Sequence, residues 1–176
     1  RMHDLRYGTH YKNSYRNLWE RNESYRNRGG LARMEVRDLV VRDNIAWANS
    51  DHGIMLRTIQ DSVIENNLSF GHPYNFENRA NAKTWRDNQE ADPRFVDAAR
   101  RDYRLTESSP ARDSAVLLNG LRRDLDGRPR AVGAAPDRGA YEFDMTAKTS
   151  ARNRPPEVDA GPDLVTTMSN PTVSLA

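Results

Sequence analysis

The feature that most constrains this sequence is an asparagine that returns every 21 to 23 residues, at Asn22, Asn44, Asn67 and Asn88. The flanking positions repeat with it. Two positions after each of the first three asparagines comes a small residue, namely Ser24, Ala46 and Ser69. Three positions after comes an aromatic residue, namely Tyr25, Trp47 and Phe70, and five positions after come Asn27, Asn49 and His72. An internal repeat of this length indicates that each unit adds one turn to a stack of units.

The repeats consist of short alternating apolar pieces that favour β-strands, such as residues 39–41, 45–47 and 54–56. No piece has helical periodicity long enough for a stable helix, and the leucine consensus of leucine-rich repeats is missing. We therefore predict an all-β solenoid whose coils stack at a strand spacing of about 4.8 Å. Equivalent asparagines then form a ladder of side-chain amides from coil to coil.

The aromatic positions are expected to stack inside the solenoid. Ile45 and Leu68 precede Trp47 and Phe70 by two residues and share their strand face, which favours burial in the core. The alternative is an exposed platform on which sugars stack. Glu23 occupies the same position before Tyr25 and breaks the apolar pattern.

These segments, above all residues 38–49, 51–56 and 62–70, resemble the right-handed parallel β-helix family of pectate-lyase-like repeat proteins. The resemblance implies a right-handed parallel β-helix over residues 1–91, of which residues 1–13 belong to a coil that we cannot align. It also implies a carbohydrate ligand, because the long flat faces of this fold commonly bind extended polysaccharides. The repeat describes a scaffold and does not specify a chemistry.

Residues 92–144 lose the repeat, and turn-forming residues separate short apolar patches there. This segment resembles the C-terminal part of many secreted bacterial β-helix proteins. We expect it to close the open end of the solenoid, which otherwise exposes unpaired backbone and a cut core. The residues expected to cover that end are Tyr103, Leu105, Ala140, Tyr141 and Phe143.

The last part of the chain predicts a linker over residues 145–154 and the start of a further domain over residues 155–176. Pro155-Pro156-Glu157-Val158 and the residues after it resemble the opening strands of immunoglobulin-like domains of the polycystic-kidney-disease type. So short a segment cannot complete a sandwich of about seven strands. Both ends of the chain are therefore interpreted as cuts, and further domains of the same polypeptide are expected partners.

Charge and composition exclude several classes of protein. The chain carries 27 Lys and Arg against 25 Asp and Glu, for a net charge of +2, and acidic residues neutralise the arginines along the same stretches. Nucleic acid is therefore not an expected partner. No apolar run approaches the roughly 20 residues of a membrane helix. The absence of cysteine excludes disulfides and thiolate metal sites.

Three residues are candidates for catalysis: His52, Arg42 and Arg57. The lyases and epimerases of the resembling family abstract the C5 proton of a uronate, which requires a base and a cation that neutralises the carboxylate. His52 is the candidate base, and either arginine is the candidate cation. The alternative interpretation makes His52 a turn residue that bonds to backbone beside Gly53.

Weaker candidates accompany these three. His72, before Pro73, is a second candidate base, and Lys83 with Arg86 matches a lyase pair by composition only; surface solvation is the alternative. Asp124, Asp126 and Gly127 resemble a calcium loop, but Arg122 and Gly133 stand where the EF-hand pattern requires acidic residues. An Asp-Gly turn is favoured, and calcium is left open as a cofactor.

Two functions of different class follow. One is a secreted or cell-surface protein that acts on extracellular polysaccharide, as a lyase or epimerase of acidic glycans. The other is a non-catalytic β-helix stalk, adhesin or surface protein that binds acidic or neutral polysaccharide. An enzyme predicts Arg, Lys or His clustered with carboxylates on one strand face across adjacent coils, whereas a stalk predicts charge spread over every face.

Overall fold

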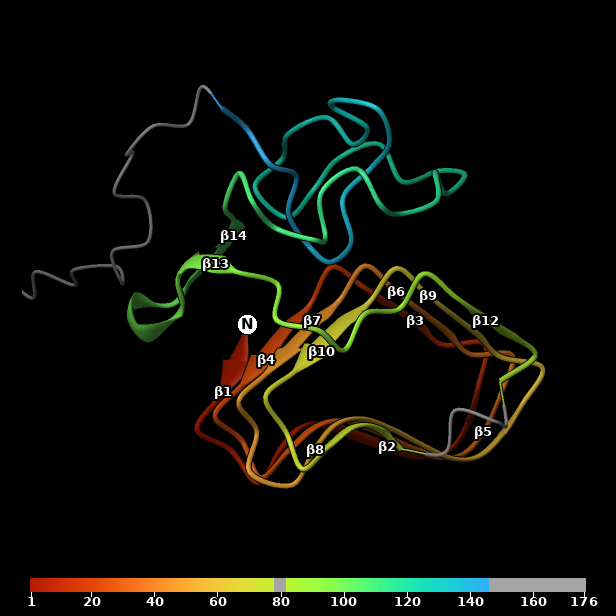
Figure 1. Ribbon diagram of the computed structural model, residues 1–176. Coiled ribbons are helices and arrows are strands. Elements are labelled where there is room, and N and C mark those ends of the chain that lie inside the picture. Colours follow the sequence, from red (N-terminus) through yellow and green to blue (C-terminus); the bar gives the residue numbers. More distant parts are fainter. Residues whose placement is uncertain (78–81, 146–176) are drawn as a thin grey trace, which may run out of the picture.

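A computed structural model of the chain describes residues 1–77 and 82–145. The chain folds into a parallel β-solenoid of about four turns, and each turn contributes one strand to each of three sheets. Viewed along the stack, the three sheets enclose one core (Figure 1). The all-β parallel solenoid predicted from the repeat is therefore confirmed. The linker and immunoglobulin-like segment, apart from Met145, lie outside the described residues.

The strands follow the order of the coils. The first sheet contains β1 (Met2–His3), β4 (Glu23–Tyr25), β7 (Ile45–Trp47) and β10 (Leu68–Phe70). The second sheet contains β2 (Tyr7–Tyr15), β5 (Gly29–Arg37), β8 (His52–Gln60) and β11 (Tyr74–Glu77). The third sheet contains β3 (Leu18–Glu20), β6 (Val40–Arg42), β9 (Val63–Glu65) and β12 (Thr84–Arg86). After the coils come β13 (Phe95–Asp97), the 3-10 helix η2 (Ala98–Arg100) and β14 (Asp102–Leu105), and β13 pairs antiparallel with β14.

The predicted asparagine ladder forms at the turn from the third sheet to the first. The backbone N–H of Asn22 donates to Asn44 Oδ1 at 2.9 Å, and that of Asn44 donates to Asn67 Oδ1 at 3.1 Å. Asn67 and Asn88 repeat the bond at 3.1 Å. The residue before each asparagine has a left-handed φ, which makes the turn tight; these residues are Arg21, Asp43, Asn66 and Asp87.

The core lies between the three sheets and is built from inward-facing aliphatic residues such as Leu31, Ile54 and Ile64. At the corner between the first and second sheets, Gly30 and Gly53 lie too close to the neighbouring coil to carry a side chain. A Cβ on Gly53 would lie 1.9 Å from Ser69 Oγ, and one on Gly30 would lie 2.2 Å from the Gly53 carbonyl oxygen. Gly30 and Gly53 therefore have no room for a side chain of their own.

The aromatic stripe lies outside the solenoid, so its predicted interior position is wrong. Ala46 belongs to the interior core, and the alternation of a strand turns its neighbours Ile45 and Trp47 outward. Tyr25, Ile45 and Leu68 are nevertheless buried, because a second apolar cluster covers them. That cluster includes Tyr103, Leu105, Ala111, Ala140 and Tyr141, which follow the coils in sequence.

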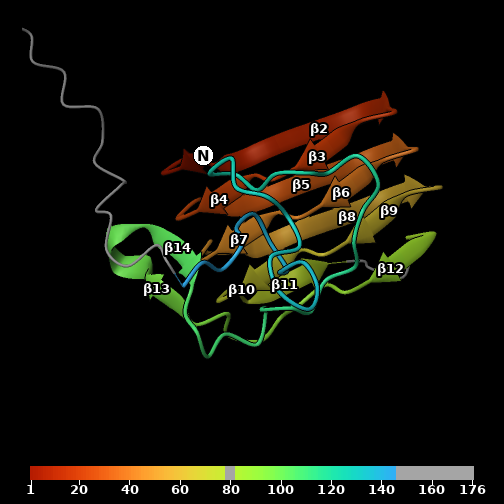
Figure 2. The ribbon, with the colours of Figure 1, turned by 90° about the horizontal axis from the view of Figure 1, so that it is seen from above.

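Residues 106–145, here called the strap, provide much of this cover. Figures 1 and 2 show the strap lying beside the coils and crossing several of them. The Gly139 N–H donates to the Asn66 carbonyl at 2.8 Å, and Arg138 lies 3.5 Å from Asp87. The strap therefore packs along the side of the stack, which differs from the expected closure of its end. The five residues that were expected to cover that end are buried, except that Phe143 is half-buried.

Arg130 joins the strap to the coils through a buried cluster of charges. Its Nη2 lies 2.6 Å from Asp43 Oδ1, and its Nε lies 3.2 Å from Glu142 Oε1. It also donates to the carbonyls of Asp137 and Gly139. Burial raises the pKa of Asp43 to about 7 and that of Glu142 to about 7, and Arg130 opposes both changes. The buried Arg130 guanidinium thus fixes the position of the strap on the coils, because its charge must remain paired with these groups.

The ladder predicts a large cost for substituting Asn44. This buried side chain accepts from Asn22 and donates to the Trp19 and Arg42 carbonyls and to Asn67. Asn44→Ala is expected to lower the free energy of unfolding by about 2–4 kcal/mol, since several buried backbone groups lose their partner. Urea denaturation measures this change. The exposed Asn119→Ala is the control and should change it by less than about 0.5 kcal/mol; equal effects would contradict the ladder's role.

Candidate functional site

The structure separates the three predicted catalytic residues. His52 and Arg57 lie on β8 in the second sheet, whereas Arg42 ends β6 in the third sheet. Arg42 Nη2 lies 2.5 Å from Glu20 Oε2 in the preceding coil. Arg57 Nη2 lies 2.8 Å from Glu77 Oε1 in the following coil. Both arginines are therefore neutralised by carboxylates of neighbouring coils, and only Arg57 shares a sheet with His52.

His52 is 3% exposed, and its ring packs over Gly29 of the neighbouring strand β5. A Cβ on Gly29 would lie 2.6 Å from His52 Nε2, so the absence of a side chain at residue 29 makes room for the imidazole. Nε2 is buried without a hydrogen-bond partner, and Nδ1 lies 3.6 Å from Asp51 Oδ2. Burial lowers the pKa of His52, and the charges of Asp51 and Glu77 oppose this change. The ring is therefore held mainly in its neutral form.

His52 belongs to a row of side chains that crosses all four coils. Tyr7, Gly29, His52 and Tyr74 are in register on β2, β5, β8 and β11. The Tyr7 and His52 rings lie 6.2 Å apart, and the Tyr7 ring stacks on His10 at 5.1 Å. Tyr74 is 61% exposed. We call Tyr7, His52 and Tyr74 the aromatic row; at the usual strand spacing, its ends are about 14 Å apart.

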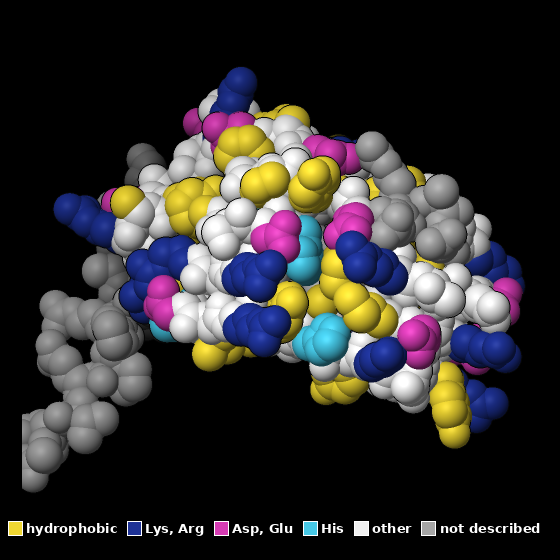
Figure 3. Space-filling view, turned by 90° about the horizontal axis from the view of Figure 1, so that it is seen from below, with side chains coloured by type: hydrophobic (Ala, Val, Ile, Leu, Met, Phe, Trp, Pro, Cys, Tyr) yellow, Lys and Arg dark blue, Asp and Glu magenta, His cyan; other side chains and the backbone are white. Residues whose placement is uncertain are grey.

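The surface around the aromatic row carries both signs of charge. Arg6 lies over the Tyr7 ring at 5.5 Å, and Arg28 lies 3.9 Å from Asp51. Figure 3 shows this face, where histidines lie among apolar, basic and acidic side chains. Sequence reasoning missed Tyr7 and Tyr74. If the repeat is extended into residues 1–13, Tyr7 occupies the same repeat position as His52, two coils earlier.

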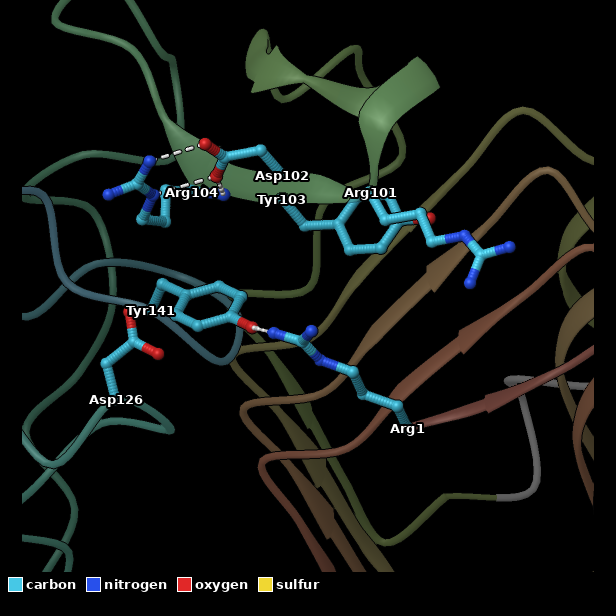
Figure 4. A pocket seen from close by; sticks show the side chains of 7 residues that line it. All are labelled: Arg1, Arg101, Asp102, Tyr103, Arg104, Asp126 and Tyr141. Carbon is cyan, nitrogen blue, oxygen red and sulfur yellow. Dashed lines mark hydrogen bonds and ion pairs between the residues drawn. The ribbon is translucent and has the colours of Figure 1, made fainter. Parts of the chain in front are cut away.

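A second group of polar residues lines a small pocket between the N-terminal strands, β14 and the strap (Figure 4); its lining residues are Arg1, Arg101, Asp102, Tyr103, Arg104, Asp126 and Tyr141. Arg104 is held by Asp102, with Nε 2.8 Å from Oδ1. Arg1 Nη2 donates to the Tyr141 hydroxyl at 2.9 Å. The polar side chains of this pocket thus bond mainly to one another.

The same network accounts for Glu23, which breaks the apolar pattern of the sequence. Glu23 is fully buried; Arg1 Nε lies 2.5 Å from its Oε2, and the Tyr141 hydroxyl donates to its Oε1. Burial raises the pKa of Glu23, and the bond from Tyr141 and the charge of Arg1 oppose this change. Glu23 therefore anchors the strap to the second coil. The sequence offers no signal for this pairing across more than a hundred residues.

The weaker candidates have structural contacts. His72 Nδ1 accepts the Asn49 N–H at 2.9 Å, and Arg86 Nη2 lies 2.7 Å from Glu65 Oε2. Asp124 accepts the N–H groups of Arg128 at 2.7 Å and Glu142 at 3.0 Å. These bonds, with the left-handed φ of Gly127, are those of an Asp-Gly turn.

The coils match a known protein family. The family described as periplasmic copper-binding protein (NosD) matches residues 1–89, which is half of the chain and includes every coil. The chain belongs to the NosD family. No curated protein matches it. The NosD match supports the β-helix scaffold and a periplasmic family background, whereas it does not test the pectate-lyase resemblance.

The described residues of this NosD-family chain do not fit a copper centre. In the described ranges, no group of three or more His, Cys, Asp or Glu side chains is placed to hold a metal, and the chain has no cysteine. His52 and His72 have a buried, unbonded Nε2, but each of these nitrogens packs against a glycine. The chain therefore has the coils of its family, but the described His, Asp and Glu side chains form no recognisable copper site.

The described part of the chain also contains no helix with the length and apolar character that crossing a membrane requires.

Tyr141→Phe tests whether the pocket network anchors the strap. The change removes the hydroxyl that donates to buried Glu23 and accepts from Arg1, so the free energy of unfolding should fall by about 1–3 kcal/mol. Limited proteolysis should cut the strap faster. Tyr103→Phe is the matched control, because Tyr103 is buried beside Tyr141 in the second apolar cluster and its hydroxyl has no carboxylate partner within residues 1–77 and 82–145. If both variants lost equal stability, the network would not be the anchor.

Proposed function

We propose that this chain is a secreted or cell-surface, non-catalytic β-helix scaffold that binds extended polysaccharide across the outer face of its second sheet. The observation that carries the proposal is the aromatic row. Tyr7, His52 and Tyr74 stand in register on the first, third and fourth coils, and Gly29 of the second coil leaves a gap that the rings on either side approach. The half-buried Tyr7 and the exposed Tyr74 present flat apolar surfaces and hydroxyl groups to sugar rings, and the buried His52 packs between their coils and supports this surface.

The charge on this face favours binding over lyase or epimerase chemistry. A uronate needs a cation that is free to meet its carboxylate, whereas Arg57 already holds Glu77 at 2.8 Å. The candidate base His52 presents an Nε2 that is buried against Gly29. Paired charges of both signs suit hydrogen bonding to sugar hydroxyls, so the ligand is an acidic or a neutral polysaccharide.

The location rests on a separate argument. The family that matches the coils is described as periplasmic, which supports a position outside the cytoplasm. An extracytoplasmic scaffold meets polysaccharide directly, in agreement with the ligand that the outer face favours.

Affinity electrophoresis on pectate, alginate and a neutral galactan tests this function. Tyr74→Ala and Tyr7→Ala are each expected to weaken binding about fivefold, which corresponds to about 1 kcal/mol. Tyr15→Ala is the matched control: Tyr15 is 71% exposed on the same strand as Tyr7, beyond the bend at Asn13. It should bind like the unmodified protein.

Two outcomes would overturn the proposal. Absence of binding to every polymer, or an equal loss in Tyr15→Ala, would remove the aromatic row as the binding site. A rise in the ultraviolet absorbance of unsaturated uronate products, lost in His52→Ala, would replace the scaffold with a lyase.

A further inference from the structure

A second ladder lies at the turn from the first sheet to the second, and its last member is a histidine. The Asn27 N–H donates to Asn49 Oδ1 at 2.9 Å, and one coil later the Asn49 N–H donates to His72 Nδ1 at 2.9 Å. The imidazole nitrogen thus takes the place of an amide oxygen. An amide oxygen accepts at every ordinary pH, whereas Nδ1 accepts only while it carries no proton.

The packing around His72 leaves little compensation for a proton. A Cβ on Gly53 would lie 2.5 Å from His72 Cδ2 and 2.6 Å from Nε2, so the ring rests against the backbone of β8. Nε2 is buried without a hydrogen-bond partner. For a protonated Nδ1, the nearby acceptor is the Asn49 carbonyl at 3.3 Å, a longer contact than the bond it would replace.

The groups that act on His72 are few. Burial is the largest influence and lowers its pKa; the Asn49 and Ala46 carbonyls oppose this change, and the nearby His52 adds to it. His52 is itself affected by Asp51, Glu77 and Arg57. Protonation of both histidines would place two positive charges near the start of β8.

We propose that His72 is an acid-sensitive joint between the third and fourth coils. Neutral His72 accepts the Asn49 N–H and completes the ladder that holds β10 and β11 against β7 and β8. Protonation breaks that bond and loosens the fourth coil. Tyr74 lies two residues after His72 on the same coil, so acid should also weaken polysaccharide binding; this second effect rests on the proposed function, whereas the joint does not.

The direction of the pH effect follows from proton linkage. Because folding lowers the pKa of His72, the joint is fully stable above the ordinary histidine value of about 6.5 and loses stability as the pH falls below it. The strap has the opposite dependence. Because burial raises the pKa of Asp43 and of Glu142 to about 7, protonation of these two carboxyl groups as the pH falls through about 7 favours the folded state. A global melting curve would mix the two effects, so the measurement must resolve regions.

Hydrogen exchange followed by mass spectrometry on the full chain, at about pH 7.5 and about pH 5, provides that resolution. After correction for intrinsic exchange rates, amides of residues 49 and 68–77 should exchange about tenfold faster at the lower pH. His72→Asn restores an amide acceptor of the kind that Asn49 supplies, and it should abolish this acceleration. His10→Asn, at an exposed histidine of the second sheet, is the control and should retain it.

The proposal is overturned if the unmodified protein shows no acceleration, or if His72→Asn shows the same acceleration. Should His72→Asn not fold, an NMR titration of the His72 ring in the unmodified protein decides the question. A pKa at or above about 6.5 would mean that folding does not favour the neutral ring, and the joint would be abandoned. Loss of polysaccharide binding without a change in exchange would instead concern only the outer face.

Discussion

The rest of this structure depends on one hydrogen bond that is repeated at each turn of the solenoid. An asparagine side chain accepts the backbone N–H of the asparagine one coil earlier, directly after a residue with left-handed φ. The turn is tight because of that φ, and its polar groups are satisfied although Asn44 and Asn67 are fully buried. This bond sets the register between coils, and register decides which side chains stand level with one another on every sheet.

The crowded corner between the first and second sheets affects which side chains of the first sheet lie outside the solenoid core. A side chain on Gly30 or Gly53 would overlap the neighbouring coil, and the strand alternation that turns Ala46 inward turns the large residues of the first sheet outward, where they need another cover. The strap provides it, with Arg130 bound to Asp43 and Tyr141 bound to Glu23. An apolar stripe that resembles a ligand platform in the sequence is thus an internal interface between the coils and the residues that follow them.

Charged residues of the coils are paired from coil to coil. Arg42 and Arg57 each hold a carboxylate of an adjacent coil, as does Arg86. Such ladders of opposite charge stabilise the stack and leave the described faces without a concentration of one sign. The family that matches the coils is described as periplasmic copper-binding protein, whereas the described side chains include no group of three or more placed to hold a metal.

The all-β solenoid, its coil boundaries and its asparagine ladder were predictable from the sequence, because they depend on residues about 22 positions apart that recur at equal intervals. The pairing of Glu23 with Tyr141 and of Asp43 with Arg130 was not, because no local pattern relates residues so far apart. The sequence also did not predict whether Tyr25 and Trp47 point into the solenoid or out of it, because that direction depends on how closely two sheets approach each other. Periodic contacts between neighbouring coils leave a mark in the sequence; the strap's contacts, made once and over long separations, exist only in the folded chain.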